Sequence, residues 1–247
     1  MRENSGILSY INGGIEITQG NNYKLAITPL VTIEMQKYEE LPNILIWKSF
    51  NKGTLAKGLC DYIITNRNVH NTETEFIMKK LYYIDSVNSF PLEEFKTMIP
   101  INMPINKSIY DNVIINQALN LKELNEIVMK IIRTDKQRVV NEENIKQQTL
   151  KSPQITKDNI LVIINGLDIM FQNSSMSDSR QAHNHLNTTL LQLRITANRR
   201  TKSFRSVILS RDPLNSGTST QQFKKRARNE GNSVYQYVSK YYADYDL

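Results

Sequence analysis

Five short apolar runs divide this chain, and they constrain its fold more than any other feature. The clearest is Ile160–Ile164, an unbroken aliphatic stretch between two asparagines. Strands that form continuous apolar runs are buried on both faces, which is typical of parallel sheets covered by helices. We therefore predict an α/β fold with a mostly parallel central sheet flanked by helices. The expected strands are Ile44–Trp47, Leu81–Ile84, Val113–Ile115, Ile160–Ile164 and Val207–Leu209.

Helices are expected between these strands, where apolar residues recur every three or four positions. Asn120 followed by Glu123 is a capping-box pattern and predicts a helix start, while Pro91 suits a first helical turn. Residues 133–159 are polar and predict a mobile excursion, and 234–245 fit either helix or strand. The helical positions are Leu55, Leu59, Tyr62 and Ile63; Leu121, Leu124, Ile127, Val128, Ile131 and Ile132; and Leu186, Leu190, Leu193 and Ala197.

Length and composition predict a soluble protein of a reducing compartment. The chain has 247 residues, of which 40% are hydrophobic, enough for a hydrophobic core that needs no disulfide or metal ion to hold it together. Its single cysteine, Cys60, excludes an intrachain disulfide and lies on the apolar face of its helix, which favours a buried structural thiol. No apolar run is long enough to span a membrane. We expect residues 1–40 to be an extension of uncertain order and 41–247 to be the core.

Positive charge is concentrated in one part of the chain. Residues 180–230 hold eleven Lys or Arg and two acids, a net of +9, whereas the whole chain carries +7. Within them a Ser-, Thr- and Gly-rich stretch leads into four cations, which are Lys224, Lys225, Arg226 and Arg228. A flexible basic loop over 213–231 suits contact with a phosphate backbone. A nuclear localisation signal or a solubilising run fits the same residues.

The residues needed for nucleotide hydrolysis are degenerate. A phosphate loop reads G-x-x-x-x-G-K-[ST], but the stretch WKSFNKGT at 47–54 keeps only the threonine. The strand 160–164 ends in Asn165, and an amide is a poorer Mg²⁺ ligand than a carboxylate. Asp168 is expected to be a turn or cap acid. We therefore expect no enzyme activity, no metal and no cofactor.

The order of the predicted strands and of the turns that follow them resembles the ATPase core of RecA-like recombinases over residues 41–247. The segment YIDSVNSF at 83–90 matches the recombinase strand end whose glutamate activates water, but Val87 stands at the glutamate position. The strand LVIIN at 161–165 matches the family's magnesium strand, again without its acid. The resemblance implies a RecA-like core with a degenerate nucleotide site. It also implies DNA-binding loops at 172–180 and 213–231.

Three further runs, at 82–92, 164–171 and 240–244, resemble subunits of the Shu complex, which are non-catalytic recombinase paralogues. The resemblance implies a nuclear heterodimer with another RecA-like paralogue inside a Shu-type heterotetramer, with no membrane association. It implies binding to single-stranded or forked DNA, and contact with recombinase and recombinase paralogues. Such a subunit would promote recombinase filament assembly in meiosis, homologous recombination and error-free repair of DNA damage. Phe90 matches a position implicated in contacting further paralogues, although a core aromatic is the other reading.

Two other functions fit the degenerate nucleotide site. One is a RecA-like scaffold subunit of an RNA-binding assembly, such as a tRNA-modification complex. The other is an active NTPase with an unusual phosphate loop. Affinity for DNA compared with tRNA at matched salt separates the first of these from the Shu-type reading.

Overall fold

Six parallel strands form one sheet in the computed structural model, in the order β5-β4-β6-β7-β3-β8. Their bounds are β3 Ile44–Trp47, β4 Lys79–Asp85, β5 Val113–Gln117, β6 Asn159–Asn165, β7 Phe204–Leu209 and β8 Tyr245–Asp246. A separate antiparallel pair is formed by β1 Leu8–Tyr10 and β2 Val31–Ile33. The structure describes residues 8–10, 31–33, 38, 41–48, 50–64, 79–148, 158–200, 203–210 and 234–246.

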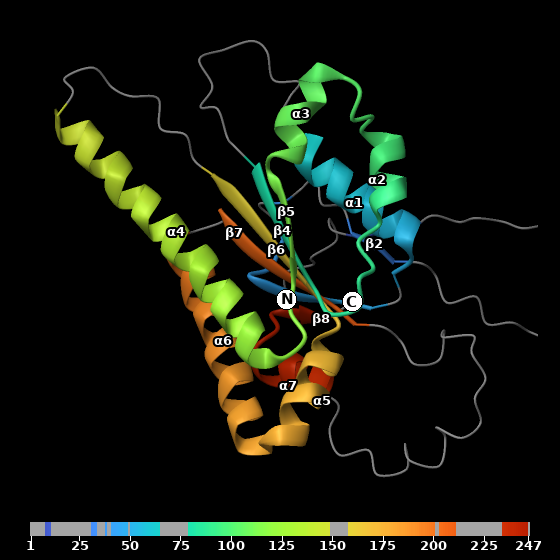
Figure 1. Ribbon diagram of the computed structural model, residues 1–247, viewed down its shortest axis with the longest axis vertical. Coiled ribbons are helices and arrows are strands. Elements are labelled where there is room, and N and C mark those ends of the chain that lie inside the picture. The colour runs from blue at the N-terminus through green and yellow to red at the C-terminus, as the bar shows by residue number, and fades with distance from the viewer. Residues whose placement is uncertain are drawn as a thin grey trace, which may run out of the picture.

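Helices cover both faces of the sheet, so the molecule has three layers (Figure 1). On one face lie α1 Lys52–Ile64, α2 Leu92–Met98 and α3 Pro104–Tyr110. On the other lie α4 Leu121–Gln148, α5 Leu167–Ser177, α6 Ser179–Arg199 and α7 Val234–Tyr241. Successive side chains of a strand point to opposite faces of the sheet. Leu161 and Ile163 pack toward α1–α3, whereas Ile160, Val162 and Ile164 pack toward α4–α7.

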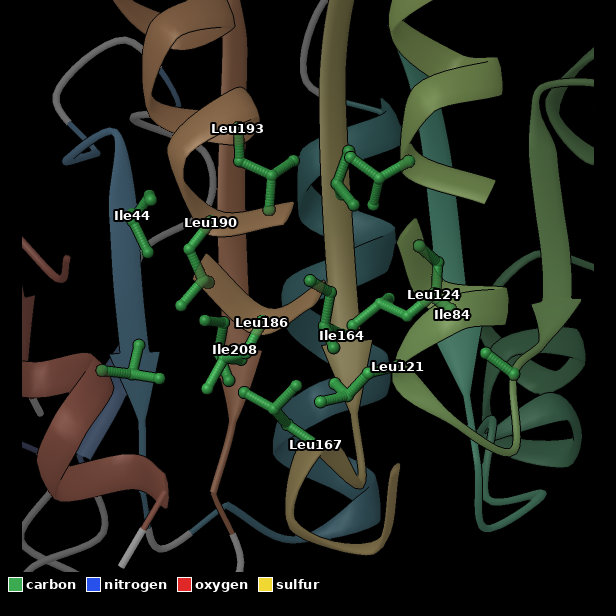
Figure 2. Packing of buried hydrophobic residues seen from close by; sticks show 14 of the residues in the cluster. Ile44, Ile84, Leu121, Leu124, Ile164, Leu167, Leu186, Leu190, Leu193 and Ile208 are labelled. Carbon is green, nitrogen blue, oxygen red and sulfur yellow. The ribbon is translucent and has the colours of Figure 1, made fainter. Parts of the chain in front are cut away.

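The packing against α6 shows why the central strands read as unbroken apolar runs. Leu186, Leu190 and Leu193 lie along one side of α6 and meet Ile164 and Ile208 from the sheet (Figure 2). All five side chains are 1% exposed or less. With the opposite strand faces covered by the other helical layer, both faces of these strands are buried, which favours apolar residues along the run.

Each of the five strands predicted from apolar runs is present, which confirms the α/β class and a sheet consistent with a RecA-like core. The capping pattern at the start of α4 is also confirmed. Glu123 N–H donates to Asn120 Oδ1 over 2.9 Å, and Glu123 Oε2 accepts from Leu119 N–H at 2.7 Å. The segment at 234–245 resolves into α7 followed by a turn into β8.

Two expectations were wrong. The polar excursion expected from residue 133 is helical up to Gln148, because α4 continues without a break, and residues 149–157 lie outside the described part. The expected first DNA-binding loop at 172–180 is also helical, since it holds the end of α5 and the start of α6 around Asp178.

Of the N-terminal extension, the residue that the structure ties most clearly to the core is Tyr38. Its side chain is 2% exposed, and its hydroxyl donates to the Ile160 carbonyl oxygen over 2.6 Å. Within the described residues, no helix is long and apolar enough to cross a membrane.

Candidate functional site

The carboxyl ends of β3, β4, β6 and β7 meet at one edge of the sheet, where open α/β folds carry their ligand sites. Only four residues, 48–51, join β3 to α1. A phosphate loop needs more chain than this to wrap a phosphate with backbone N–H groups. The connection is therefore shorter than the motif that it would replace.

The start of α1 is also capped by its own side chains. Thr54 N–H donates to Asn51 Oδ1 over 2.7 Å, and Asn51 N–H donates to Thr54 Oγ1 over 3.0 Å. This reciprocal pair satisfies backbone donors that a helix N-terminus would otherwise offer to an anion. Thr54, the one residue in place for a phosphate loop, thus serves as a capping residue here.

A polar cluster joins the ends of β4 and β6, where Asn165 stands at the position of the magnesium acid and Asp85 lies two residues before Val87, the position of the catalytic glutamate. Asp85 is 4% exposed and Asn165 is fully buried. Asn165 Nδ2 lies 3.2 Å from Asp85 Oδ1 and 2.6 Å from Ser89 Oγ. Asp85 also accepts from the backbone N–H groups of Val87 and Ser89. Its carboxylate is therefore committed to closing the turn 85–90.

Gly166 brings this turn into contact with the end of β6. Its φ is +79°, in the left-handed region, and a Cβ there would lie 1.9 Å from Ser86 Oγ. The Ser86 hydroxyl instead donates to the Gly166 carbonyl oxygen over 2.9 Å. The groups at the carboxyl ends of these two strands bond to one another. Among the described residues, no group of three or more His, Cys, Asp or Glu is placed to hold a metal ion.

Phe90 follows the degenerate turn and is neither free nor fully enclosed. Its ring is half-buried and meets Tyr83 edge-on with centroids 5.0 Å apart, and Phe95 at 5.7 Å. It packs at the border of the core cluster on the α1–α3 face. Its role in partner contact stays a prediction.

Beyond Phe90 lies a surface that the sequence reasoning missed, which we term the α2–α3 apolar surface. It consists of four large apolar side chains that are 41–61% exposed: Leu92, Met98, Ile101 and Met103. Exposed apolar groups concentrated in one part of a surface are a mark of protein–protein contact. The signal in the sequence was the apolar-rich stretch MIPINMPI at 98–105, which has no helical periodicity to bury it.

The four predicted DNA-contacting residues, Lys224, Lys225, Arg226 and Arg228, lie outside the described residues. The structure does place the residues on either side of 211–233. Tyr235 Oη, just after this segment, donates to Asp168 Oδ1 over 2.9 Å and lies 3.3 Å from the Leu209 carbonyl oxygen, just before it. Asp168, expected to be a turn or cap acid, lies in the first turn of α5 and holds this hydroxyl.

Two further residues, Cys60 and His183, lie away from this edge. Cys60 is 3% exposed, and burial, with a smaller effect of the nearby Asp61 carboxylate, raises the pKa of its thiol to about 12. It is the buried thiol that the helix pattern predicted. His183 meets Phe171 edge-on, with ring centroids 5.0 Å apart.

Comparison with known proteins places this geometry in a family. Residues 44–243 match the family model described as "Shu complex component Csm2, DNA-binding". Chromosome segregation in meiosis protein 2 of Saccharomyces cerevisiae is 33% identical over 221 residues, covering 84% of this chain and 98% of the yeast protein. The protein of that name from Candida glabrata is 32% identical, covering 85% of this chain and 97% of its own length. The chain therefore belongs to the family of the Shu complex component Csm2.

Proposed function

We propose that this chain is a non-catalytic, DNA-binding subunit of a Shu-type complex. The observation that carries the proposal is the internally bonded nucleotide site. Asn51 and Thr54 cap the helix that would bind phosphates. Asp85 bonds to Asn165, which stands at the position of the magnesium acid. A RecA-like sheet that is retained without its chemistry fits a binding role. The family description, which names DNA binding and the Shu complex, supports the same role.

DNA contact is assigned to Lys224, Lys225, Arg226 and Arg228. Four cations within five residues suit phosphate oxygens, which carry no sequence information, so binding would be largely independent of sequence. The described residues on either side of the segment meet at Tyr235 and Leu209. This contact supports a loop that leaves and re-enters the core at one place.

Assembly is assigned to the α1–α3 face. Phe90 and the α2–α3 apolar surface present apolar area that the described core does not cover. A second RecA-like paralogue would form the heterodimer, within a heterotetramer that contacts recombinase and further paralogues. The complex would act in the nucleus and promote recombinase filament assembly in error-free repair by homologous recombination. Relatives named for chromosome segregation in meiosis support a role in recombination.

The alternative, a scaffold subunit of an RNA-binding assembly, explains the degenerate site equally well, but the family match favours DNA. The test is fluorescence anisotropy with the full chain and its co-purifying subunits. Forked DNA, single-stranded DNA and tRNA of similar length are compared at one salt concentration. We expect tighter binding to the DNAs. Preferential binding of tRNA would overturn the proposed function in favour of the scaffold role.

A further inference from the structure

A row of aromatic rings connects α5, α6 and α7, and we call it the aromatic row; its members Phe171 and Tyr237 are half-buried and pack against the core. Its members are Phe171, His183, Tyr237 and Tyr241. Neighbouring ring centroids are 5.0 Å apart for Phe171 and His183, 6.2 Å for His183 and Tyr237, and 5.0 Å for Tyr237 and Tyr241. His183 is exposed, and Tyr241 is 55% exposed. The helices that carry the row lie on the same face of the sheet (Figure 1).

The exposed part of the row is not needed to attach α7 to the core. That attachment is made by a stripe of α7 in which Val238 is fully buried and Tyr235, Tyr237 and Tyr242 pack against the same cluster. Tyr237 and Tyr241 are one turn apart on the flank of this stripe, and only Tyr237 is tied down, by a 2.7 Å bond to Asn187 Oδ1. A helix attached through one stripe ordinarily presents polar residues elsewhere. Tyr241 and His183 are the exposed members of the row, each in ring contact with Tyr237, and their rings are accessible to a ligand.

Positive charge borders the row. Lys240 Nζ lies 5.2 Å from the centroid of the Tyr241 ring. Arg194 reaches the same end of α7, where its guanidinium lies 3.4 Å from the Tyr241 carbonyl oxygen. The one carboxylate that the structure places at this guanidinium, Asp244, is paired with it at 3.0 Å. The row therefore combines π faces with cations, and α7 begins directly after the basic segment in the sequence.

We propose that the aromatic row binds unpaired bases of single-stranded DNA by stacking, with Tyr241 and His183 as the outer contacts. This inference rests on the proposed DNA-binding function and extends it to a second surface. Aromatic platforms beside cations are the usual way in which proteins hold single strands without reading sequence. Lys240 Nζ, beside the Tyr241 ring, can contact a backbone phosphate of the bound strand. Duplex DNA keeps its base faces stacked, so the row contributes only to binding of single strands.

The test compares two substitutions at one position in the full chain. Tyr241→Phe keeps the ring, whereas Tyr241→Leu keeps apolar area and removes it. Stacking on an aromatic side chain is lost in the second variant, so affinity for an oligothymidine strand should fall about 5- to 100-fold. Tyr241→Phe should bind like the unsubstituted protein, and duplex DNA of equal length should bind all three alike. The salt dependence should not change in Tyr241→Leu, because no phosphate contact is removed.

Two controls keep the experiment decisive. Trp47, the single tryptophan, is fully buried, so its fluorescence reports whether each variant is folded. Leu191→Ala removes another exposed apolar side chain from α6 and should not alter binding. The stacking site is overturned if the double variant Tyr241→Leu, His183→Ala binds single strands like the unsubstituted protein. It is also overturned if that variant loses affinity for duplex DNA as much as for single strands. In both cases the proposed DNA-binding function stands. If the unsubstituted protein binds no DNA, the proposed DNA-binding function is contradicted, and so is the stacking site that rests on it.

Discussion

Asn165 Nδ2 lies 3.2 Å from Asp85 Oδ1 and ties the last residue of β6 to the last residue of β4. An amide beside a buried carboxylate donates a hydrogen bond, whereas a second carboxylate would add like charge. The position at which RecA-like ATPases carry a magnesium acid has thus become part of the protein's own hydrogen bonding. The amide that replaces the acid is therefore the group that bonds to Asp85.

Restoring the acid should therefore destabilise the fold. Asn165→Asp places two buried carboxyls in contact and should lower the free energy of unfolding by about 1–3 kcal/mol at neutral pH. The new carboxyl would have a folded-state pKa above its unfolded value, so the loss grows as pH rises and shrinks in acid. Urea unfolding at pH 5 and pH 7 measures this difference. Asn184→Asp, the same change at an exposed position on α6, is the control and should show neither effect.

Catalysis is the second prediction, and it follows from the capped start of α1. We expect no ATP turnover above background by the full chain. Removing the cap with Asn51→Ala should cost about 0.5–2 kcal/mol of stability without any effect on ATP. A coupled ATPase assay with a parallel thermal melt measures both quantities. Steady hydrolysis that disappears in Thr54→Ala would contradict this account of the site.

The basic segment gives a prediction on salt dependence. Each phosphate that is neutralised on a single strand contributes about −0.7 to the slope of log affinity against log salt. Changing Lys224, Lys225, Arg226 and Arg228 to alanine should therefore weaken binding steeply at low salt and flatten the slope by roughly 2 to 3 units. Partner association should survive, because the change leaves the apolar core and the α2–α3 apolar surface intact.

A matched control removes the same charge elsewhere. Lys52, Lys57, Lys107 and Lys122 are exposed on α1, α3 and α4, and their quadruple alanine variant should retain most of the salt slope. If the variant of the basic segment keeps both affinity and slope, the cluster is a localisation signal or a solubilising run. The DNA contact would then have to lie elsewhere on the molecule.

Phe90 is tested against its neighbour Phe95, which is 1% exposed. Phe95→Ala opens a cavity in the core and should destabilise the fold by about 3–5 kcal/mol. Phe90→Ala should cost less, because its ring is only half-buried, and should lose one partner in a pull-down while Trp47 fluorescence stays native. An unfolded Phe90→Ala variant would instead identify Phe90 as a core aromatic.

The thiol of Cys60 offers a measure of local opening. Because burial raises its pKa to about 12, it stays protonated in the folded state up to well above pH 8 and should react slowly with a disulfide reagent. Denaturant should restore the reactivity of an ordinary thiol, so the folded-state rate at pH 8 reports opening of α1. A reaction with the native protein as fast as with the denatured one would show that the helix does not shield the sulfur.

Some of this fold could be predicted from the sequence because its cause is local. The run 160–164 favours a strand buried on both faces, and the side chains of Asn120 and Glu123 cap α4 with residues a few positions away. The departures from a phosphate loop at 47–54 were equally readable, since they depend only on which residues stand at fixed positions. The same holds for Cys60, whose helix face is set by the spacing of its apolar neighbours.

Tertiary structure decided the rest, since the deciding contacts join distant segments. Residues 133–148 lack an apolar stripe, yet Asp135 on α4 is buried against Arg200 beyond the end of α6, with 3.0 Å between carboxylate and guanidinium. Likewise, the sequence pattern of 234–245 by itself fits either a helix or a strand. Burial of Val238 selects the helix α7, and pairing with β3 selects the strand β8. The aromatic row joins residues of three helices separated by up to 70 positions, Phe171 to Tyr241. No local periodicity encodes such a contact, because it exists only once the helices have packed on the sheet.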